Sequence, residues 1–269
     1  MEDKKIKLFY FTGTGNSLRV LEIMKKVFEK NGKTVHLCSI TDGLCYDKEK
    51  YAYIGISFPV YSWGVPRVVR RFLANLPKVN YNQKVFVVAT MGGKDEEGWA
   101  LVDARKILME KGYIITNSDS INMPNNWIVL SNPPSRAKAK IILDEGEEKA
   151  GKFAHNVLSN IEQNKKFIWP KIGLLALILY YLFKYCGIYH MWRMFRANER
   201  CISCNLCSTI CPTKSIMIID GKPKWTSVCE QCMRCINFCP EQAIEQLESI
   251  GKGSKRDRYH EPHYNPLTK

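Results

Sequence analysis

The strongest constraint on this chain is a cysteine pattern that occurs twice, the second copy beginning 28 residues after the first. Each copy reads C-x-x-C-x-x-C-x-x-x-C-P. The copies are Cys201, Cys204, Cys207, Cys211 and Pro212, and then Cys229, Cys232, Cys235, Cys239 and Pro240. Three cysteines at this spacing can cap three irons of a [4Fe-4S] cluster from one side, so the fourth thiolate comes from elsewhere. In two-cluster proteins with this spacing, it comes from the other copy.

The crossed pattern predicts two sets of cluster ligands, one of Cys201, Cys204, Cys207 and Cys239, and the other of Cys229, Cys232, Cys235 and Cys211. Zinc ribbons use paired C-x-x-C knuckles and have no use for a third cysteine two residues further on. A disulfide framework suits a short secreted chain, and nothing here is typical of secretion. Residues 198–248 therefore resemble a bacterial-type ferredoxin that carries two [4Fe-4S] clusters.

Length and composition indicate a full-sized domain plus a small one, since the chain has 269 residues, 45% of them hydrophobic and 25% charged. The three cysteines outside the repeats, Cys38, Cys45 and Cys186, are expected to be buried or free thiols. Together with low-potential clusters they indicate a reducing compartment and an anaerobic host. The amino-terminal MEDKKIKLFYF lacks the pattern of a signal peptide, so we expect a cytoplasmic protein.

The net charge of +14 is uneven, because residues 165–197 contain six Lys or Arg and no Asp or Glu, whereas residues 198–250 carry five and six, a balance of −1. A basic surface attracts an acidic protein, an anionic membrane or nucleic acid. No nucleic-acid motif accompanies the charge. We therefore expect acidic redox partners first, membrane contact second and no nucleic acid, and the oligomeric state is left open.

An anion-binding turn is predicted near the amino terminus. Residues 5–12 have the pattern of a buried strand and residues 17–30 that of an amphipathic helix, and the turn between them contains Thr12, Gly13, Thr14, Gly15, Asn16 and Ser17. Backbone N–H groups and the dipole at a helix start favour a phosphate. A dinucleotide fingerprint would need glycine in place of Leu18 and an acid near residues 36–39, and a Walker loop would need Gly-Lys-Ser or Gly-Lys-Thr. The turn resembles the phosphate loop of flavodoxins, which hold FMN, although an ordinary strand-to-helix turn has the same elements.

Two further loops follow predicted strands and belong to the same expected site. The strand at residues 51–57 leads into Pro59, Val60, Tyr61, Ser62, Trp63 and Gly64, and the strand at residues 84–90 leads through Thr90 into Met91, Gly92 and Gly93. In an open parallel sheet, ligands bind outside the carboxyl ends of the strands where strand order reverses. Tyr61 and Trp63 are candidates to stack on a flavin, unless they only pack on the next helix. Residues 120–127 form a further candidate loop.

These segments together resemble the fused flavodoxin and two-cluster ferredoxin proteins of anaerobic bacteria. The resemblance implies a flavodoxin-like, doubly wound α/β domain with a five-stranded parallel sheet of order 2-1-3-4-5 over residues 1–164. A connector at 165–197, a small α+β ferredoxin module at 198–250 and a basic tail at 251–269 would follow. Within the first domain, residues 94–97 are expected to be a solvated helix start, with helices at about 97–111 and 135–165.

The connector contains twelve residues without a charge, 172–183, before Lys184. Twelve helical residues cover about 18 Å, short of the roughly 30 Å hydrocarbon core of a bilayer. We therefore expect a helix packed between the two domains, with an interfacial membrane anchor as the alternative. The tail is expected to be disordered or draped over a neighbouring part of the chain.

The function predicted from these features is electron transfer between an FMN and two [4Fe-4S] clusters. A flavin holds one or two electrons, whereas each cluster passes one at a time. The alternative is an FMN-dependent NAD(P)H or quinone oxidoreductase, although no catalytic acid-base constellation stands out. A sensor that acts through its basic surface would need a recognition element, which the sequence lacks.

Overall fold

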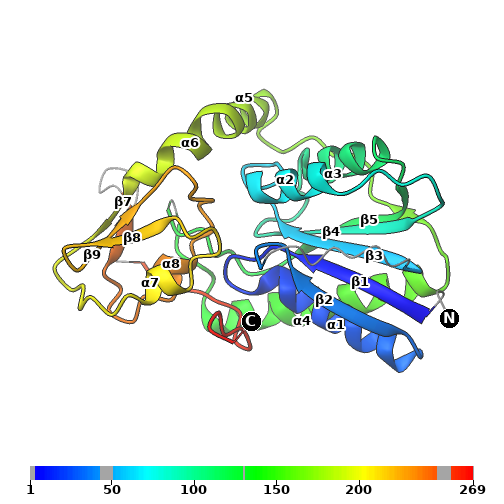
Figure 1. Cartoon of the computed structure of the whole chain (residues 1–269), viewed down its shortest axis with the longest axis horizontal. Helices are drawn as coiled ribbons and strands as arrows, with labels where there is room; N and C mark the ends of the chain where they lie inside the picture. Colours follow the sequence, from blue (N-terminus) through cyan, green and yellow to red (C-terminus); the bar gives the residue numbers. More distant parts are fainter. Residues whose placement is uncertain (1–3, 43–50, 130, 247–255, 269) are drawn as a thin grey trace.

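The computed structural model describes residues 4–42, 51–129, 131–246 and 256–268. Its larger part is a parallel six-stranded sheet of order β2-β1-β3-β4-β5-β6. Figure 1 shows α1 and α4 on one face of the sheet and α2 and α3 on the other. The strands are β1 (Lys5–Tyr10), β2 (Thr34–Ser39), β3 (Tyr53–Pro59), β4 (Lys84–Met91), β5 (Ile114–Asn122) and β6 (Gln163–Asn164), and the helices are α1 (Asn16–Lys30), α2 (Arg67–Asn75), α3 (Ala100–Met109) and α4 (Arg136–Leu158).

The sheet has an apolar core on each face because its central strands are buried on both sides. Phe86 and Val88 of β4 point into the core under α1 and α4, whereas Val85 and Val87 point into the core under α2 and α3. This alternation follows from the period of two in a strand. The α/β class and the order of the first five strands confirm the prediction, and the topology resembles the flavodoxin fold.

A sixth strand corrects the prediction of five. Gln163 and Asn164 pair with Asn117 and Ser118 of β5, and the N–H of Lys165 donates to the carbonyl of Ser118 at 2.8 Å. Two residues are too short for a strand pattern to be recognised in the sequence. The segment was expected to belong to the helix that begins near Ser135, but α4 ends at Leu158.

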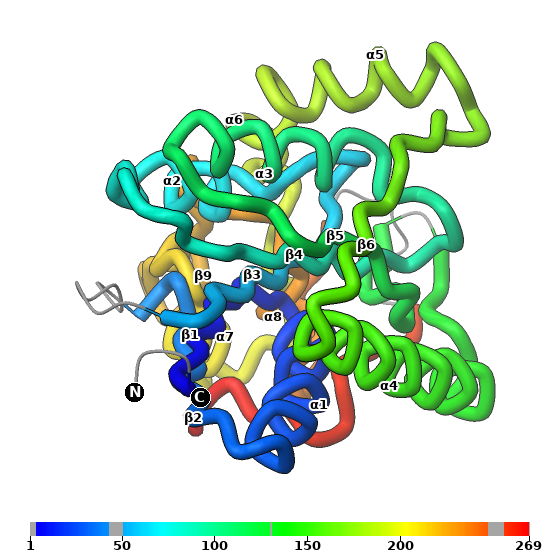
Figure 2. Tube along the Cα trace, turned by 90° about the vertical axis from the view of Figure 1, so that its right-hand side faces the viewer, coloured from blue at the N-terminus to red at the C-terminus, as the bar shows by residue number. Residues whose placement is uncertain are grey.

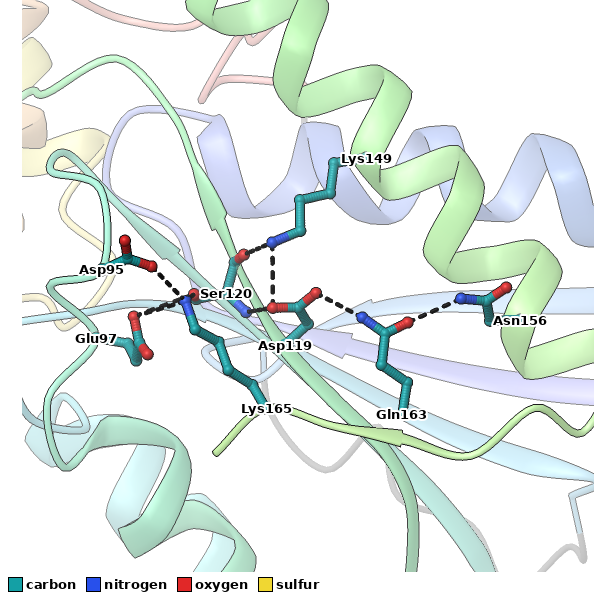
Figure 3. Close-up of polar contacts among 8 residues, drawn as sticks. All are labelled: Asp95, Glu97, Asp119, Ser120, Lys149, Asn156, Gln163 and Lys165. Carbon is teal, nitrogen blue, oxygen red and sulfur yellow. Dashed lines mark hydrogen bonds and ion pairs between the residues drawn. The ribbon is translucent and has the colours of Figure 1, made fainter. Parts of the chain in front are cut away.

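The new strand is held by polar side chains at the edge of the sheet (Figure 3). The amide of Gln163 donates to Asp119 at 2.9 Å, and Lys149 pairs with the same carboxylate at 3.1 Å. The ammonium of Lys165 pairs with Asp95 at 3.1 Å and Glu97 at 3.2 Å. Burial alone would lower the pKa of Lys165, but its hydrogen bond to Asp95 and the charge of Glu97 raise it overall.

The Lys165 contacts also correct the reading of residues 94–97 as a solvated helix start. The helix α3 begins only at Ala100, and the side chain of Glu97 is 3% exposed. A carboxylate at such a depth needs a partner, and Lys165, 68 residues further along the chain, supplies it. The ion pair therefore fixes the loop that follows β4.

The smaller part of the structure is an α+β unit at the carboxyl ends of the first strands (Figure 1). It has two short antiparallel sheets, and the turn of the β8–β9 hairpin lies at Asp220 and Gly221, both with positive φ, as its Asp-Gly sequence predicts. Ile128 and Val129, from the loop after β5, complete its core. Its elements are β7 (Phe195–Ala197), α7 (Leu206–Thr209), β8 (Ile216–Ile219), β9 (Lys222–Trp225), α8 (Arg234–Asn237) and β10 (Ile244–Gln246).

The connector between the two units is one helical stretch from Leu174 to Met194, and it is the one helix of the described residues that is long and apolar enough to cross a membrane. It comprises α5 (Leu174–Leu182), a π-helical turn (Phe183–Gly187), α6 (Ile188–His190) and a 3₁₀ turn (Met191–Met194). The helix was expected to pack between the two domains, and it joins the two units with only part of its surface packed. Ala176, Tyr180 and Ile188 are buried, but most of the other apolar side chains are exposed.

Two remaining expectations concern the tail and the isolated cysteines. Residues 256–268 drape over both units, with Tyr259 and Tyr264 buried, whereas residues 251–255 lie outside the described part. Cys186 is an exposed free thiol. Cys38 is disulfide-bonded, which corrects the expected free thiol, and Cys45 lies outside the described residues.

We expect Lys165→Met to lower the free energy of unfolding by about 3 kcal/mol, because it leaves the buried Glu97 carboxylate without its cation. Chemical denaturation of the purified protein measures this change. Lys140→Met is the matched control, since it breaks an exposed pair with Asp144 and is expected to leave the free energy of unfolding nearly unchanged. Equal effects of the two substitutions would contradict a structural role for Lys165.

Candidate cofactor sites

Two groups of four thiols form in the smaller unit, and each combines cysteines from both copies of the repeat. Cys239 of the second copy lines one small cavity together with the first three cysteines of the first copy, Cys201, Cys204 and Cys207. The other group surrounds the buried thiol of Cys235. Its other members are Cys232, Cys229 and Cys211, each close enough to interact electrostatically with that thiol. This is the crossed arrangement that the spacing predicts.

The backbone repeats as closely as the cysteines do. Three pairs of residues 28 positions apart have left-handed φ angles between 47° and 62°, namely Ser203 and Gln231, Asn205 and Met233, and Lys214 and Gln242. Such angles are uncommon outside glycine and curl the chain tightly around each group. Each crossing cysteine also accepts an N–H···S hydrogen bond from the residue four positions on, Ser215 to Cys211 at 3.2 Å and Ala243 to Cys239 at 3.3 Å.

The thiol groups could hold a four-iron cluster, which takes one thiolate on each iron. Burial raises the pKa of Cys207 to about 11 and that of Cys229 to about 12, so both thiols stay protonated until a metal displaces the proton. Among the residues that the structure describes, no three Cys, His, Asp or Glu side chains converge on one ion position. A four-iron cluster does not require such convergence, since each thiolate binds a different iron.

A cavity of about 780 Å³ lies at the carboxyl ends of β1, β3 and β4. It brings together nearly all of the residues expected to bind the flavin, and only Gly15 and Gly64 are not on its wall. The predicted residues that line it are Thr12, Gly13, Thr14, Asn16, Ser17, Pro59, Val60, Tyr61, Ser62, Trp63, Thr90, Met91, Gly92 and Gly93.

The turn between β1 and α1 can accept a phosphate at this cavity. Gly15, the residue that precedes α1, has a φ of 108°, and no side chain caps the first turn of the helix. Its N–H groups are therefore available to an anion. The hydroxyls of Thr12, Thr14 and Ser17 lie beside them. Two of these hydroxyls already take part in other hydrogen bonds, since Thr12 accepts from the N–H of Gly15 at 3.0 Å and Ser17 shares a bond with Thr90 at 2.7 Å. The Asn16 side chain is also occupied, since its amide donates to Pro124 at 2.9 Å and its oxygen accepts from Tyr259 at 3.0 Å.

The aromatic loop after β3 forms a tight turn at the rim of the cavity. Ser62 and Trp63 both have positive φ, and Tyr61 and Gly64 exchange two backbone hydrogen bonds across them. Neither central residue is a glycine, so this turn is strained, as backbone at binding sites often is. The Tyr61 hydroxyl is buried and has no hydrogen-bond partner among the described residues. A ligand in the cavity is the natural partner for it.

Glu96, from the loop after β4, and three other parts of the cavity wall were not predicted as site residues. The loop after β5 was only a weak candidate, and it contributes Pro124, Asn125, Asn126 and Trp127. The connector and the second cysteine loop gave no signal, because neither has a flavin motif. The connector supplies Leu179, Leu182, Phe183, Cys186, Gly187 and Met191, and the cysteine loop supplies Gln231 and Met233.

The second cysteine loop packs directly against the phosphate-binding turn. A Cβ at Gly13 would collide with the carbonyl oxygen of Cys232, so this approach requires glycine. The buried guanidinium of Arg234 donates to the carbonyls of Gly13 at 2.8 Å and Thr12 at 2.7 Å. These contacts satisfy its donors without neutralising its charge, which remains close behind the turn and favours an anion there.

The tail braces the same turn from outside. The N–H of Glu261 donates to the carbonyl of Thr14 at 2.8 Å, and the side chain of Tyr264 packs on Gly15. On the inner side, the amide of Asn126 donates to the Thr14 hydroxyl at 2.9 Å. The turn is thus fixed by segments more than 100 residues away in the sequence.

Solved structures resemble the chain over more than half of its length, and curated proteins match it in sequence over about a fifth. No family model matches it. Solved structures that it resembles include a flavodoxin from the domain Archaea, 15% identical with a TM-score of 0.39, over 57% of this chain and 99% of that one. Another is a short-chain flavodoxin associated with a bacterial microcompartment, 16% identical with a TM-score of 0.44, over 58% and 97%. A flavo di-iron protein variant from Thermotoga maritima is 15% identical with a TM-score of 0.42, over 59% and 36%.

Two curated proteins match a shorter stretch. The pyruvate synthase subunit PorD of Thermotoga maritima is 39% identical over 59 residues, which are 20% of this chain and 60% of that protein. The PorD subunit of Methanocaldococcus jannaschii is 36% identical over 61 residues, 21% of this chain and 71% of that protein. Over that fifth of its length, the chain belongs to the family of the PorD subunits of pyruvate synthase.

Proposed function

We propose that this chain is an electron-transfer protein that holds FMN in the large cavity and a [4Fe-4S] cluster in each group of four cysteines. FMN exchanges one or two electrons and each cluster exchanges one, so together they link two-electron and one-electron carriers. One observation carries the proposal. The second cysteine loop supplies Gln231 and Met233 to the wall of the flavin cavity, so the two kinds of redox site share a boundary.

The residues on the cavity wall suit the parts of FMN. The free N–H groups of the first turn of α1 and the hydroxyls of Thr12, Thr14 and Ser17 would hold the phosphate. Apolar groups such as Val60 and Met91 would hold the ring system. One terminal phosphate is accommodated, and the dinucleotide glycine and ribose acid are missing.

The two cysteine groups have different surroundings, which suggests an order of transfer. The group of Cys229, Cys232, Cys235 and Cys211 borders the flavin cavity, and Cys229 and Cys235 are buried. In the other group Cys204 is exposed, and the neighbouring Ile202 is 63% exposed. We infer that a redox partner docks at the exposed group. The basic connector, with six Lys or Arg and no Asp or Glu over residues 165–197, favours an acidic partner.

The first test identifies the flavin. The protein, purified anaerobically and then denatured, is expected to release FMN at about one molecule per chain, as measured by chromatography of the supernatant. Release of FAD, or a protein that binds no flavin when mixed with FMN, would contradict the assignment of the cavity.

The second test concerns the crossed cysteines. Cys239→Ser is expected to damage the cluster of Cys201, Cys204 and Cys207, and Cys211→Ser the cluster that borders the flavin. Iron content and electron paramagnetic resonance of the reduced protein report which cluster is lost. Cys186→Ser is the control, because this exposed thiol belongs to neither group. Loss of only the cluster nearer in sequence would refute the crossed assignment, and retained FMN would show that each variant is folded.

The third test separates a carrier from an enzyme. The oxidised protein is mixed anaerobically with reduced ferredoxin, NADH or NADPH, and the bleaching of flavin and cluster absorption is followed. We expect rapid and joint bleaching with reduced ferredoxin and little with either nicotinamide. Fast turnover with NADH or NADPH would instead favour the FMN-dependent oxidoreductase. Flavin and clusters that never exchange electrons would exclude both forms of the proposal.

A further inference from the structure

The outer side of the connector helix carries an unbroken apolar stripe, which we call the outer stripe. Its members recur every three or four residues and therefore lie on one side of the helix. Each is between 43% and 69% exposed. The outer stripe consists of Leu174, Leu175, Ile178, Tyr181, Tyr185 and Tyr189, and Leu182 beside it is also exposed but lines the cavity. Figure 2 shows α5 at the outer edge of the molecule, with no other element beyond it.

The opposite, inner side of the connector helix packs against the sheet unit. Tyr180 stacks on Trp99 of the sheet unit, and its hydroxyl donates to Asp103 at 2.5 Å. Lys184, the one charged residue within the apolar run, turns inward, where its ammonium donates to the Tyr180 hydroxyl at 2.8 Å and lies 3.8 Å from Asp103. The same ammonium lies 5.9 Å and 5.4 Å from the ring centroids of Tyr181 and Tyr185, so the cation borders the outer stripe at these two tyrosines.

These inner contacts also argue against a helix that crosses a bilayer. A spanning helix would have to leave Asp103 and the cavity wall, and it would carry Lys184 into the hydrocarbon. An apolar side turned to a membrane surface, with the opposite side on the protein, is typical of interfacial helices. The exposed Trp169, just before the helix, is a residue type that settles at such a surface.

The charge around the outer stripe has one sign. Residues 163–198 contain six Lys or Arg and no Asp or Glu, and three of the six, Lys165, Lys184 and Arg196, pair with carboxylates of other segments. Lys166 and Lys171 precede the helix and Arg193 lies near its end, and all three are exposed. A second copy of this chain would bring the same positive charge face to face, which disfavours self-association. An anionic surface would be attracted along the whole helix.

We propose that the outer stripe binds the surface of a bilayer that contains anionic lipids, with the helix lying in the plane of the headgroups. The same helix lines the flavin cavity with Leu179, Phe183 and Met191. Membrane binding would thus place the cavity about one helix diameter, roughly 10 Å, from the lipid.

The test is cosedimentation of the full-length protein with vesicles of phosphatidylcholine alone or with 30% phosphatidylglycerol, an experimental choice of about one anionic lipid in three. We expect binding to the anionic vesicles that weakens at high salt, because the Debye length falls from about 10 Å at 0.1 M to about 3 Å at 1 M. The variant Leu175→Glu with Ile178→Glu changes two stripe residues that do not line the cavity, and its partition coefficient is expected to fall at least about tenfold.

The control is Met109→Glu with Ile141→Glu, which has the same change of charge at two apolar residues that are 63% and 59% exposed elsewhere. We expect it to bind within about twofold of the unchanged protein. Retained flavin absorption shows that both variants are folded. The proposal fails if the unchanged protein ignores anionic vesicles, or if both variants bind equally. It also fails if only detergent releases the protein, which would indicate a spanning helix, or if the stripe variant converts a dimer into a monomer.

Discussion

The buried guanidinium of Arg234 is the interaction on which the arrangement of the two units depends. It joins the second cysteine loop to the phosphate-binding turn by donating to Thr12 and Gly13, and a third bond, to Ile210 at 2.9 Å, ties in the first cysteine run. Each carbonyl is buried, so loss of the donor would leave it unsatisfied at a cost of about 1–3 kcal/mol. A single side chain thus couples the fold of the cysteine unit to the shape of the flavin cavity.

The phosphate-binding turn is consequently ordered by the protein before any ligand arrives. Arg234 holds its carbonyls, Asn126 holds the Thr14 hydroxyl and Glu261 holds the backbone of Thr14. A ligand that enters a preformed turn does not have to order it, and this raises affinity without further contacts. The same rigidity fixes the boundary between the flavin cavity and the cysteine loop, which is the property that electron transfer requires.

Sequence patterns predicted those parts of the structure whose chemistry is local. The three cysteines of each C-x-x-C-x-x-C run lie close together in the sequence, and the three predicted loops of the large cavity follow strands whose apolar runs are plain in the sequence. The roles of Glu97, Lys165 and Arg234 could not be read in this way. Each is one charged residue among many in the sequence. Its structural role depends on a partner far away in the chain, as with the pairing of Lys165 and Glu97 across 68 residues. The packing of the tail could not be predicted either, because nothing in a basic segment with Gly and Pro indicates that Tyr259 and Tyr264 are buried.

The connector shows why composition alone was ambiguous. Some of its apolar residues pack on the rest of the protein and others form the exposed outer stripe. The sequence alone does not show which side of the helix faces the protein. The inner residues Ala176, Tyr180 and Ile188 are fully used by packing. Packing explains nothing about the outer stripe, since polar residues there would leave the fold and the cavity wall intact and would make the surface more soluble. A row of exposed Leu, Ile and Tyr side chains over four helical turns, with the exposed cations Lys166, Lys171 and Arg193 near its ends, therefore points to a surface outside this chain that the helix is built to meet.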